Sequence, residues 1–110
     1  MSSHTVPVNQ TTPDNIQALT EKAMAQIKAV YARHDIHPDA VQEQMLFSHV
    51  RAMASRSLTG ELLPEVDESL FEDISPETMR LAQQIVDLFG NLPKEEAWLL
   101  SVHIEVARAN

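Results

Sequence analysis

The chain has 110 residues, of which 44% are hydrophobic, a net charge of −8 and no cysteine. One domain fits this length, and disulfides, thiolate metal sites and a cysteine nucleophile are excluded. Eight basic residues against sixteen acidic ones argue against direct nucleic-acid binding. Short apolar runs and the lack of a signal peptide favour a cytoplasmic protein that does not cross a membrane.

The composition favours helices from the start of the chain. Only two glycines and 5% aromatic residues suit an all-α fold better than a sandwich or a barrel. Residues 1–12 are polar and unpatterned, so we expect a flexible N-terminal tail ahead of a single helical domain over residues 13–110. Pro13 after Thr12 marks a helix start, and apolar residues at spacings of three and four predict a helix as far as Arg33.

A break at residues 33–38 separates this helix from a second one. Asp39 marks the second start, and the helix is predicted to reach about Ser57. Its apolar residues cover more than half of its circumference, which is typical of a helix near the middle of a bundle. Because this apolar surface exceeds what one buried side needs, we also expect a homodimer.

The next segment is acidic. Gly60 and Pro64 are expected to bracket a turn, and residues 66–71 are predicted to form a short amphipathic helix. No basic residue occurs between Ser57 and Met79, whereas the acidic residues there are Glu61, Glu65, Asp67, Glu68, Glu72, Asp73 and Glu77. We interpret this run as a solvated surface, with an acidic docking face as the alternative.

Two further helix starts complete the chain. A serine cap followed by proline at residues 75–76 opens the third long helix, and Gly90 stands where a left-handed C-terminal cap belongs. Pro93 opens the last helix, and the helix dipole accounts for Glu95 and Glu96 in its first turn. The predicted fold is therefore all-α, a compact bundle of about five helices.

Histidine is the residue type that could carry chemistry. The spacing of His34 and His37 could bring two imidazoles to one metal ion, but an ordinary exposed loop without a third ligand is the simpler interpretation. His49 and His103 each lie on a largely apolar helical stripe, and periodicity alone favours structural histidines there. No nucleophile elbow, phosphate loop or zinc-protease motif is present, so we expect no enzyme and assign no metal or cofactor.

A family resemblance begins at these two histidines. The stretch from Met45 to Arg56 resembles the first signature of the phosphotransferase-system regulation domain (PRD), in which an apolar residue, a histidine, a helical turn and an arginine precede a short loop. Residues 61–64 are similar to the family's extended apolar-proline piece, 82–86 to its A-x-x-I/V helix, and 95–104 to its second signature, an acidic helix start before an apolar-x-His-apolar run. The match is collinear over about residues 41–109, but Ser48 replaces the aspartate that usually precedes the first histidine.

The resemblance implies a regulatory role. PRDs are helical bundles, commonly dimeric, in bacterial antiterminators and transcription activators, and their paired histidines accept phosphoryl groups from the sugar phosphotransferase system. By this resemblance His49 and His103 are the phosphorylation sites, and phosphotransferase-system phosphocarrier proteins are the partners. Arg51 and Arg56 are the candidate neighbours of the phosphate.

Two interpretations within the family and one outside it remain. PRDs usually accompany an RNA- or DNA-binding domain, for which 110 residues leave no room. The chain is then either a stand-alone sensor that pairs with a PRD-containing regulator or a PRD cut from a longer protein. The alternative outside the family is a helical scaffold or partner-binding module whose histidines are structural and never phosphorylated.

Overall fold

The structure is a computed structural model that describes residues 13–110, so the expected flexible tail lies outside the described residues. The elements in chain order are α1 (Pro13–Arg33), α2 (Ala40–Thr59), the 3₁₀ turn η1 (Glu68–Phe71), α3 (Pro76–Asp87) and α4 (Glu95–Arg108). The all-α prediction is confirmed, with four α-helices over these residues. No helix among them is long and apolar enough to span a membrane.

The fifth predicted helix is wrong as an α-helix, because η1 is a single 3₁₀ turn of four residues. Leu70 is 74% exposed, so most of the contact of η1 with the bundle falls to Phe71, whose ring lies 6.2 Å from that of Trp98. A short helix must offset its costly first turn by burying apolar surface, and this segment buries little.

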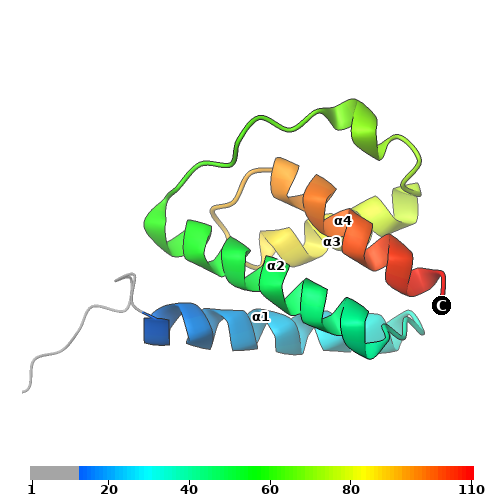
Figure 1. The fold of residues 1–110 in the computed structure, drawn as a ribbon, viewed down its shortest axis with the longest axis horizontal. Coiled ribbons are helices and arrows are strands. Elements are labelled where there is room, and N and C mark those ends of the chain that lie inside the picture. The colour runs from blue at the N-terminus through cyan, green and yellow to red at the C-terminus, as the bar shows by residue number, and fades with distance from the viewer. Residues whose placement is uncertain (1–12) are drawn as a thin grey trace, which may run out of the picture.

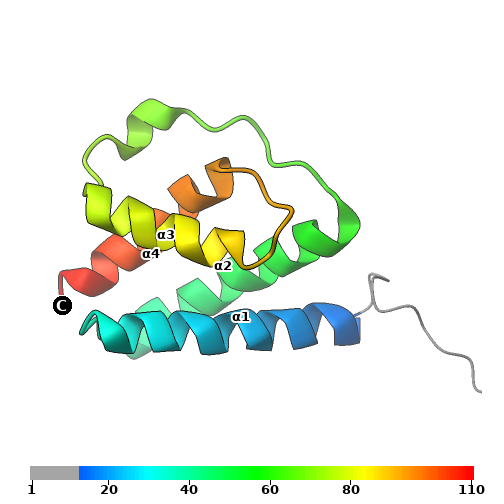
Figure 2. The ribbon, with the colours of Figure 1, turned by 180° about the vertical axis from the view of Figure 1, so that it is seen from behind.

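Contacts between the four helices close a ring. α1 packs along α2, α2 crosses α4, α4 packs along α3, and α3 returns to α1 (Figures 1 and 2). Fully buried side chains from all four helices fill the centre: Ile27, Val50, Met53, Ile85, Leu100 and Ile104. The predicted apolar stripes thus face one shared core.

Local signals set the starts of α2 and α3 as predicted, whereas α2 ends at Thr59, slightly beyond the predicted Ser57, and α4 begins at Glu95 rather than at Pro93. The side chain of Asp39 accepts a hydrogen bond from the backbone of Gln42, whose side chain accepts one from the backbone of Asp39, and this capping box starts α2. Gly60 ends α2 with a φ of +77°, and its N–H donates to the carbonyl of Arg56 at 2.9 Å. Ser75 caps α3 through the backbone N–H of Thr78.

The predicted turn between Gly60 and Pro64 is not formed. Residues 60–67 have no regular secondary structure, and the segment 60–75, named the strap here, arches over α4 (Figure 1). The reason is topological, because α3 begins at the opposite end of the bundle from the end of α2. All seven acidic residues between Ser57 and Met79 are exposed, in agreement with a solvated surface.

Candidate functional site

Three polar pairs join α2 to α4, and they recur every seven residues. The pairs are Gln42 with Asn110, which lies just past the end of α4, His49 with His103, and Arg56 with Glu96. Residue numbers rise along α2 as they fall along α4, so the two helices run antiparallel where they cross (Figure 1). Seven residues are close to two helical turns, so the three pairs form one line, named the polar seam here.

The two histidines meet in the middle of the polar seam. The ring centroids of His49 and His103 lie 4.9 Å apart, with 35° between the ring planes. Both side chains are half-buried, His49 more deeply than His103. His49 Nε2 is enclosed and has no hydrogen-bond partner among residues 13–110. A buried histidine with a purely structural role is expected to use both ring nitrogens, so His49 departs from that pattern.

The surroundings of both rings favour the neutral imidazole. Burial, followed by the positive charges that His103 and Arg56 can carry, lowers the pKa of His49 to about 4. Burial also lowers the pKa of His103. At neutral pH the seam therefore holds two adjacent uncharged imidazoles, each with a ring nitrogen that carries a lone pair.

A buried ion pair closes one end of the polar seam. Arg56 Nε and Nη2 each donate to a different carboxylate oxygen of Glu96 at 2.7 Å. The Glu96 side chain is 1% exposed. The helix dipole explains an acidic residue in the first turn of α4, but it does not explain why this one is buried. The missed signal is a four-residue spacing, because Glu96 is in phase with the buried Leu100 and Ile104.

Other residues that the sequence singled out lie away from the polar seam. Arg51 turns to α1, where its Nη1 donates to Oε1 of Gln17 at 3.0 Å. His34 is exposed, and the Nε2 of the exposed His37 lies 2.7 Å from Oδ1 of Asp35. Among residues 13–110 no group of three or more histidine, cysteine, aspartate or glutamate side chains is placed to hold a metal ion.

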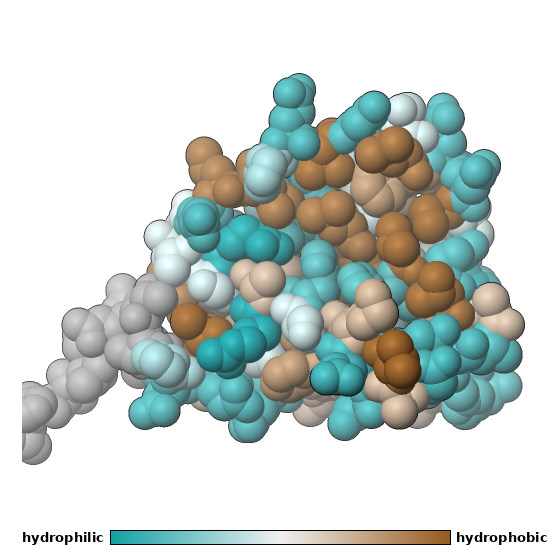
Figure 3. Space-filling view, viewed as in Figure 1, coloured by the Kyte–Doolittle hydropathy of each residue, from teal (hydrophilic) through white to brown (hydrophobic). Residues whose placement is uncertain are grey.

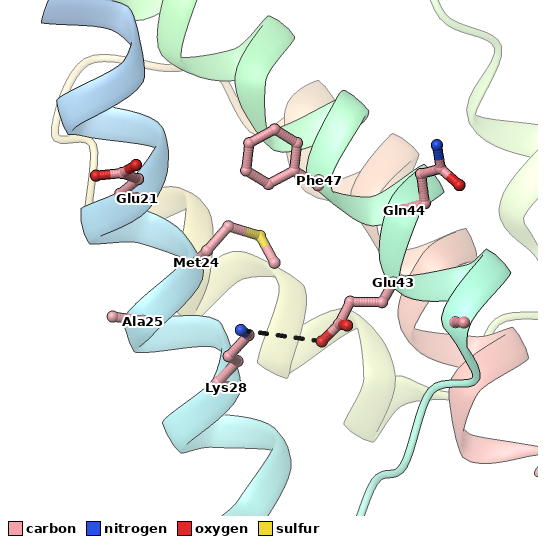
Figure 4. Close-up of a pocket in the computed structure, with 8 residues that line it drawn as sticks. Glu21, Met24, Ala25, Lys28, Glu43, Gln44 and Phe47 are labelled. Carbon is pink, nitrogen blue, oxygen red and sulfur yellow. Dashed lines mark ion pairs between the residues drawn. The ribbon is translucent and has the colours of Figure 1, made fainter.

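A hollow of about 530 Å³ opens between α1 and α2, outside the polar seam (Figure 4). Met24 and Phe47 supply its apolar lining, while Lys28 and Glu43 approach each other across it to 4.0 Å. The two charged side chains are 64% and 51% exposed, so their attraction is weak. This open groove carries no convergent chemistry comparable to that of the histidines.

Comparison with known proteins assigns the family. No protein-family model and no curated protein matches the sequence. Among solved structures, the chain is similar to the crystal structure of a PRD-containing transcription regulator from Lactobacillus casei ATCC 334, with 30% sequence identity and a TM-score of 0.76 over 97% of this chain and 98% of that one. Such similarity over nearly the whole length defines a helical regulatory domain. The chain belongs to the PRD family.

Proposed function

We propose that the chain is a regulatory domain of sugar phosphotransferase-linked transcriptional control. In this proposal His49 and His103 accept phosphoryl groups from phosphocarrier proteins, and the domain acts through protein–protein contacts rather than as an enzyme. The observation that carries the proposal is the contact of the two imidazoles, 4.9 Å apart in a half-buried seam. The similarity to a solved transcription regulator supports the regulatory part.

Each ring has the chemical form that phosphoryl transfer requires. A neutral imidazole nitrogen attacks the phosphorus of a donor phosphohistidine in line, and a new P–N bond forms as the donor's P–N bond breaks. The proton on the second nitrogen of the acceptor stays in place, and the donor ring leaves as neutral imidazole when its own second nitrogen is protonated. The lowered pKa values of both rings keep the attacking nitrogen unprotonated at neutral pH.

An apolar surface borders the histidines and supports a homodimer. Exposed apolar side chains of α2 and α4 lie close to them along the two helices: Val41 (65% exposed), Met45 (57%), Val102 (43%) and Val106 (44%). Figure 3 shows this face, with apolar side chains gathered over α4 and the strap. Scattered apolar residues are ordinary on surfaces, but a group of them beside one pair of helices is typical of a contact face. A second copy of this chain is the partner that we infer.

Phosphorylation would change the charge of that face. A phosphoryl group adds about −2 to a region where apolar side chains surround two neutral rings. Arg56, which is bonded to Glu96, is the guanidinium next along the polar seam, whereas Arg51 points to α1, where it is bonded to Gln17. A dimer packed through this face would rearrange, which makes the modification a switch and not a turnover step.

Direct labelling tests the proposal. The protein is incubated with labelled phosphoenolpyruvate, Enzyme I and the histidine phosphocarrier protein, and acid-labile, base-stable label is measured. We expect label on the wild type and on the His34→Ala control, less on His49→Ala or His103→Ala, and none on the double variant. If no phosphocarrier labels the wild type, the scaffold alternative with structural histidines is favoured.

Sedimentation tests the homodimer separately. We expect the wild type to sediment as a dimer at micromolar concentrations, and Met45→Asp to shift it towards the monomer because the charge falls within the apolar face. The matched control is Leu88→Asp, an exposed apolar residue (53%) just past the end of α3 and outside this face. A monomeric wild type would exclude the dimer and leave the phosphorylation proposal intact.

A further inference from the structure

Arg56 and Glu96 face each other as opposite charges, and the exposed Glu61 is a further negative charge that acts on Arg56. Two parallel hydrogen bonds of 2.7 Å, one from Nε and one from Nη2, hold the carboxylate. The Glu96 side chain is 1% exposed and the Arg56 side chain 16% exposed, so water screens the pair little. The guanidinium is the direct counter-charge of this enclosed carboxylate.

The pair is also next to the histidines along the same line. Arg56 follows His49 by seven residues in α2, and Glu96 precedes His103 by seven residues in α4. Side chains of a helix lean towards its N-terminus, so Arg56 leans back in the direction of His49. The positive charge of Arg56 acts on the His49 ring, since it is one of the causes that lower the pKa of His49.

A phosphoryl group on these rings would compete with Glu96 for the guanidinium. It carries about −1.5 to −2 of charge and three acceptor oxygens, and arginine binds phosphate through two parallel bonds as it binds a carboxylate. Once the guanidinium has turned away, the enclosed carboxylate lacks a counter-charge and has to move towards water.

This movement of Glu96 would take place at one end of the polar seam. Arg56 lies in the last turn of α2, and Glu96 lies in the first turn of α4. This is where the strap leaves α2 and where the chain returns into α4, with Asn91 bonded to Ser57 beside it. Loss of the ion pair would loosen the contact of the two helices at this end first.

Resting on the proposed phosphorylation of the histidines, we propose that Glu96 is a positioning residue that holds Arg56 in the unmodified protein and gives it up to the phosphoryl group. The ion pair then converts phosphorylation into a movement of α4 against α2. It also opposes phosphorylation, because the phosphoryl group gains the guanidinium only at the expense of Glu96.

The equilibrium of phosphoryl exchange with the histidine phosphocarrier protein tests this role. Glu96→Gln keeps the shape of the side chain and removes its charge, so Arg56 is free for the phosphoryl group and the ratio of phosphorylated to unmodified chain rises about fivefold or more. The matched control Glu95→Gln, one residue earlier in the same turn, stays within about twofold of the wild type. In an Arg56→Gln background, Glu96→Gln has no further effect because no guanidinium is left to release.

A second measurement uses the wild type alone and does not depend on how well the variants fold. The Arg56 Nε–H resonance is followed by NMR before and after phosphorylation, and it shifts if the guanidinium changes partner. An unshifted resonance, or an unchanged ratio in folded Glu96→Gln, would overturn the inference while label on the histidines leaves the proposed function standing. Absence of label on the wild type would overturn both.

Discussion

Helix α4 contacts its two neighbours through different chemistry. Towards the core it meets α3, whose buried face is mainly apolar: Leu81, Ala82, Ile85 and Val86. The polar contacts between α3 and α4 lie at one end, where Thr78 bonds to Glu105 and Arg108. Towards α2 it presents the polar seam of an amide pair, an imidazole pair and an ion pair. Apolar burial stabilises a bundle directly, whereas buried polar groups first lose their hydration and recover that loss only through their partners.

The difference indicates a division of roles. The contact of α3 with α4 holds the domain together, and the polar seam carries groups whose charge can change. A buried ion pair is weak evidence of stabilisation, since packed apolar side chains often replace one without loss. The position of the Arg56–Glu96 ion pair beside the two histidines thus explains its presence better than a contribution to stability does.

The largest expected effect comes from removing one partner of the ion pair, and replacing both partners shows whether the pair itself stabilises the fold. Arg56→Met leaves Glu96 buried without a counter-charge, and we expect the free energy of unfolding to fall by about 4 kcal/mol at neutral pH. Arg56→Met combined with Glu96→Leu should recover most of this loss, because two apolar side chains fill the space. Urea denaturation measures both. A double variant as unstable as the single one would mean that the polar seam itself stabilises the fold.

A core truncation tests the apolar side of the comparison. Ile85 is fully buried, and Ile85→Ala should lower the free energy of unfolding by about 3 kcal/mol through lost burial and a residual cavity. Leu88→Ala, near the end of the same helix and 53% exposed, serves as the control and should cost less than about 0.5 kcal/mol. Similar losses in the two variants would contradict an apolar core centred on α3.

Because burial lowers the pKa of His49, we expect the free energy of unfolding to fall in acid. The folded-state pKa of His49 is about 4, below the usual 6.5, so the unfolded chain binds more protons between these values. The contribution of His49 to stability is therefore complete above about pH 6.5 and falls by roughly 3 kcal/mol as the pH drops towards 4.

Denaturation of His49→Gln between pH 7 and pH 4 measures that contribution. We expect a flatter pH profile for this variant than for the wild type, and an unchanged profile for His34→Gln, whose side chain is exposed. Parallel profiles for the wild type and His49→Gln would show that the ring is not held neutral by burial.

The smallest expected effect lies at the open end of the polar seam. Gln42 completes the capping box of α2 and bonds to Asn110. Both hydrogen bonds are open to water, so Gln42→Ala should lower the free energy of unfolding by about 1 kcal/mol. Gln44→Ala, on the exposed side of the same turn, is the control with no expected loss. A decrease above about 2 kcal/mol for Gln42→Ala would mean that the polar seam stabilises the fold substantially, against the view that the apolar contact of α3 with α4 does so.

Local signals in the sequence predicted the helices well. Asp39, Gly60 and Ser75 act within a few residues of themselves, so the starts of α2 and α3 and the end of α2 follow from caps that any chain with these residues can form. Periodicity likewise predicted the stripes that carry His49 and His103, because the helical repeat alone decides which residues share a face.

Which faces meet was decided only by the tertiary structure. The antiparallel register of α2 and α4 brings together residues 40 positions apart, and it turned Glu96 from an ordinary first-turn acid into the buried partner of Arg56. The same assembly left residues 60–67 of the strap without regular secondary structure and η1 too little buried to become an α-helix. The packing of the four helices is decided by the total apolar surface that they bury together. This total depends on residues far apart in the sequence, so a window of a few residues cannot predict it.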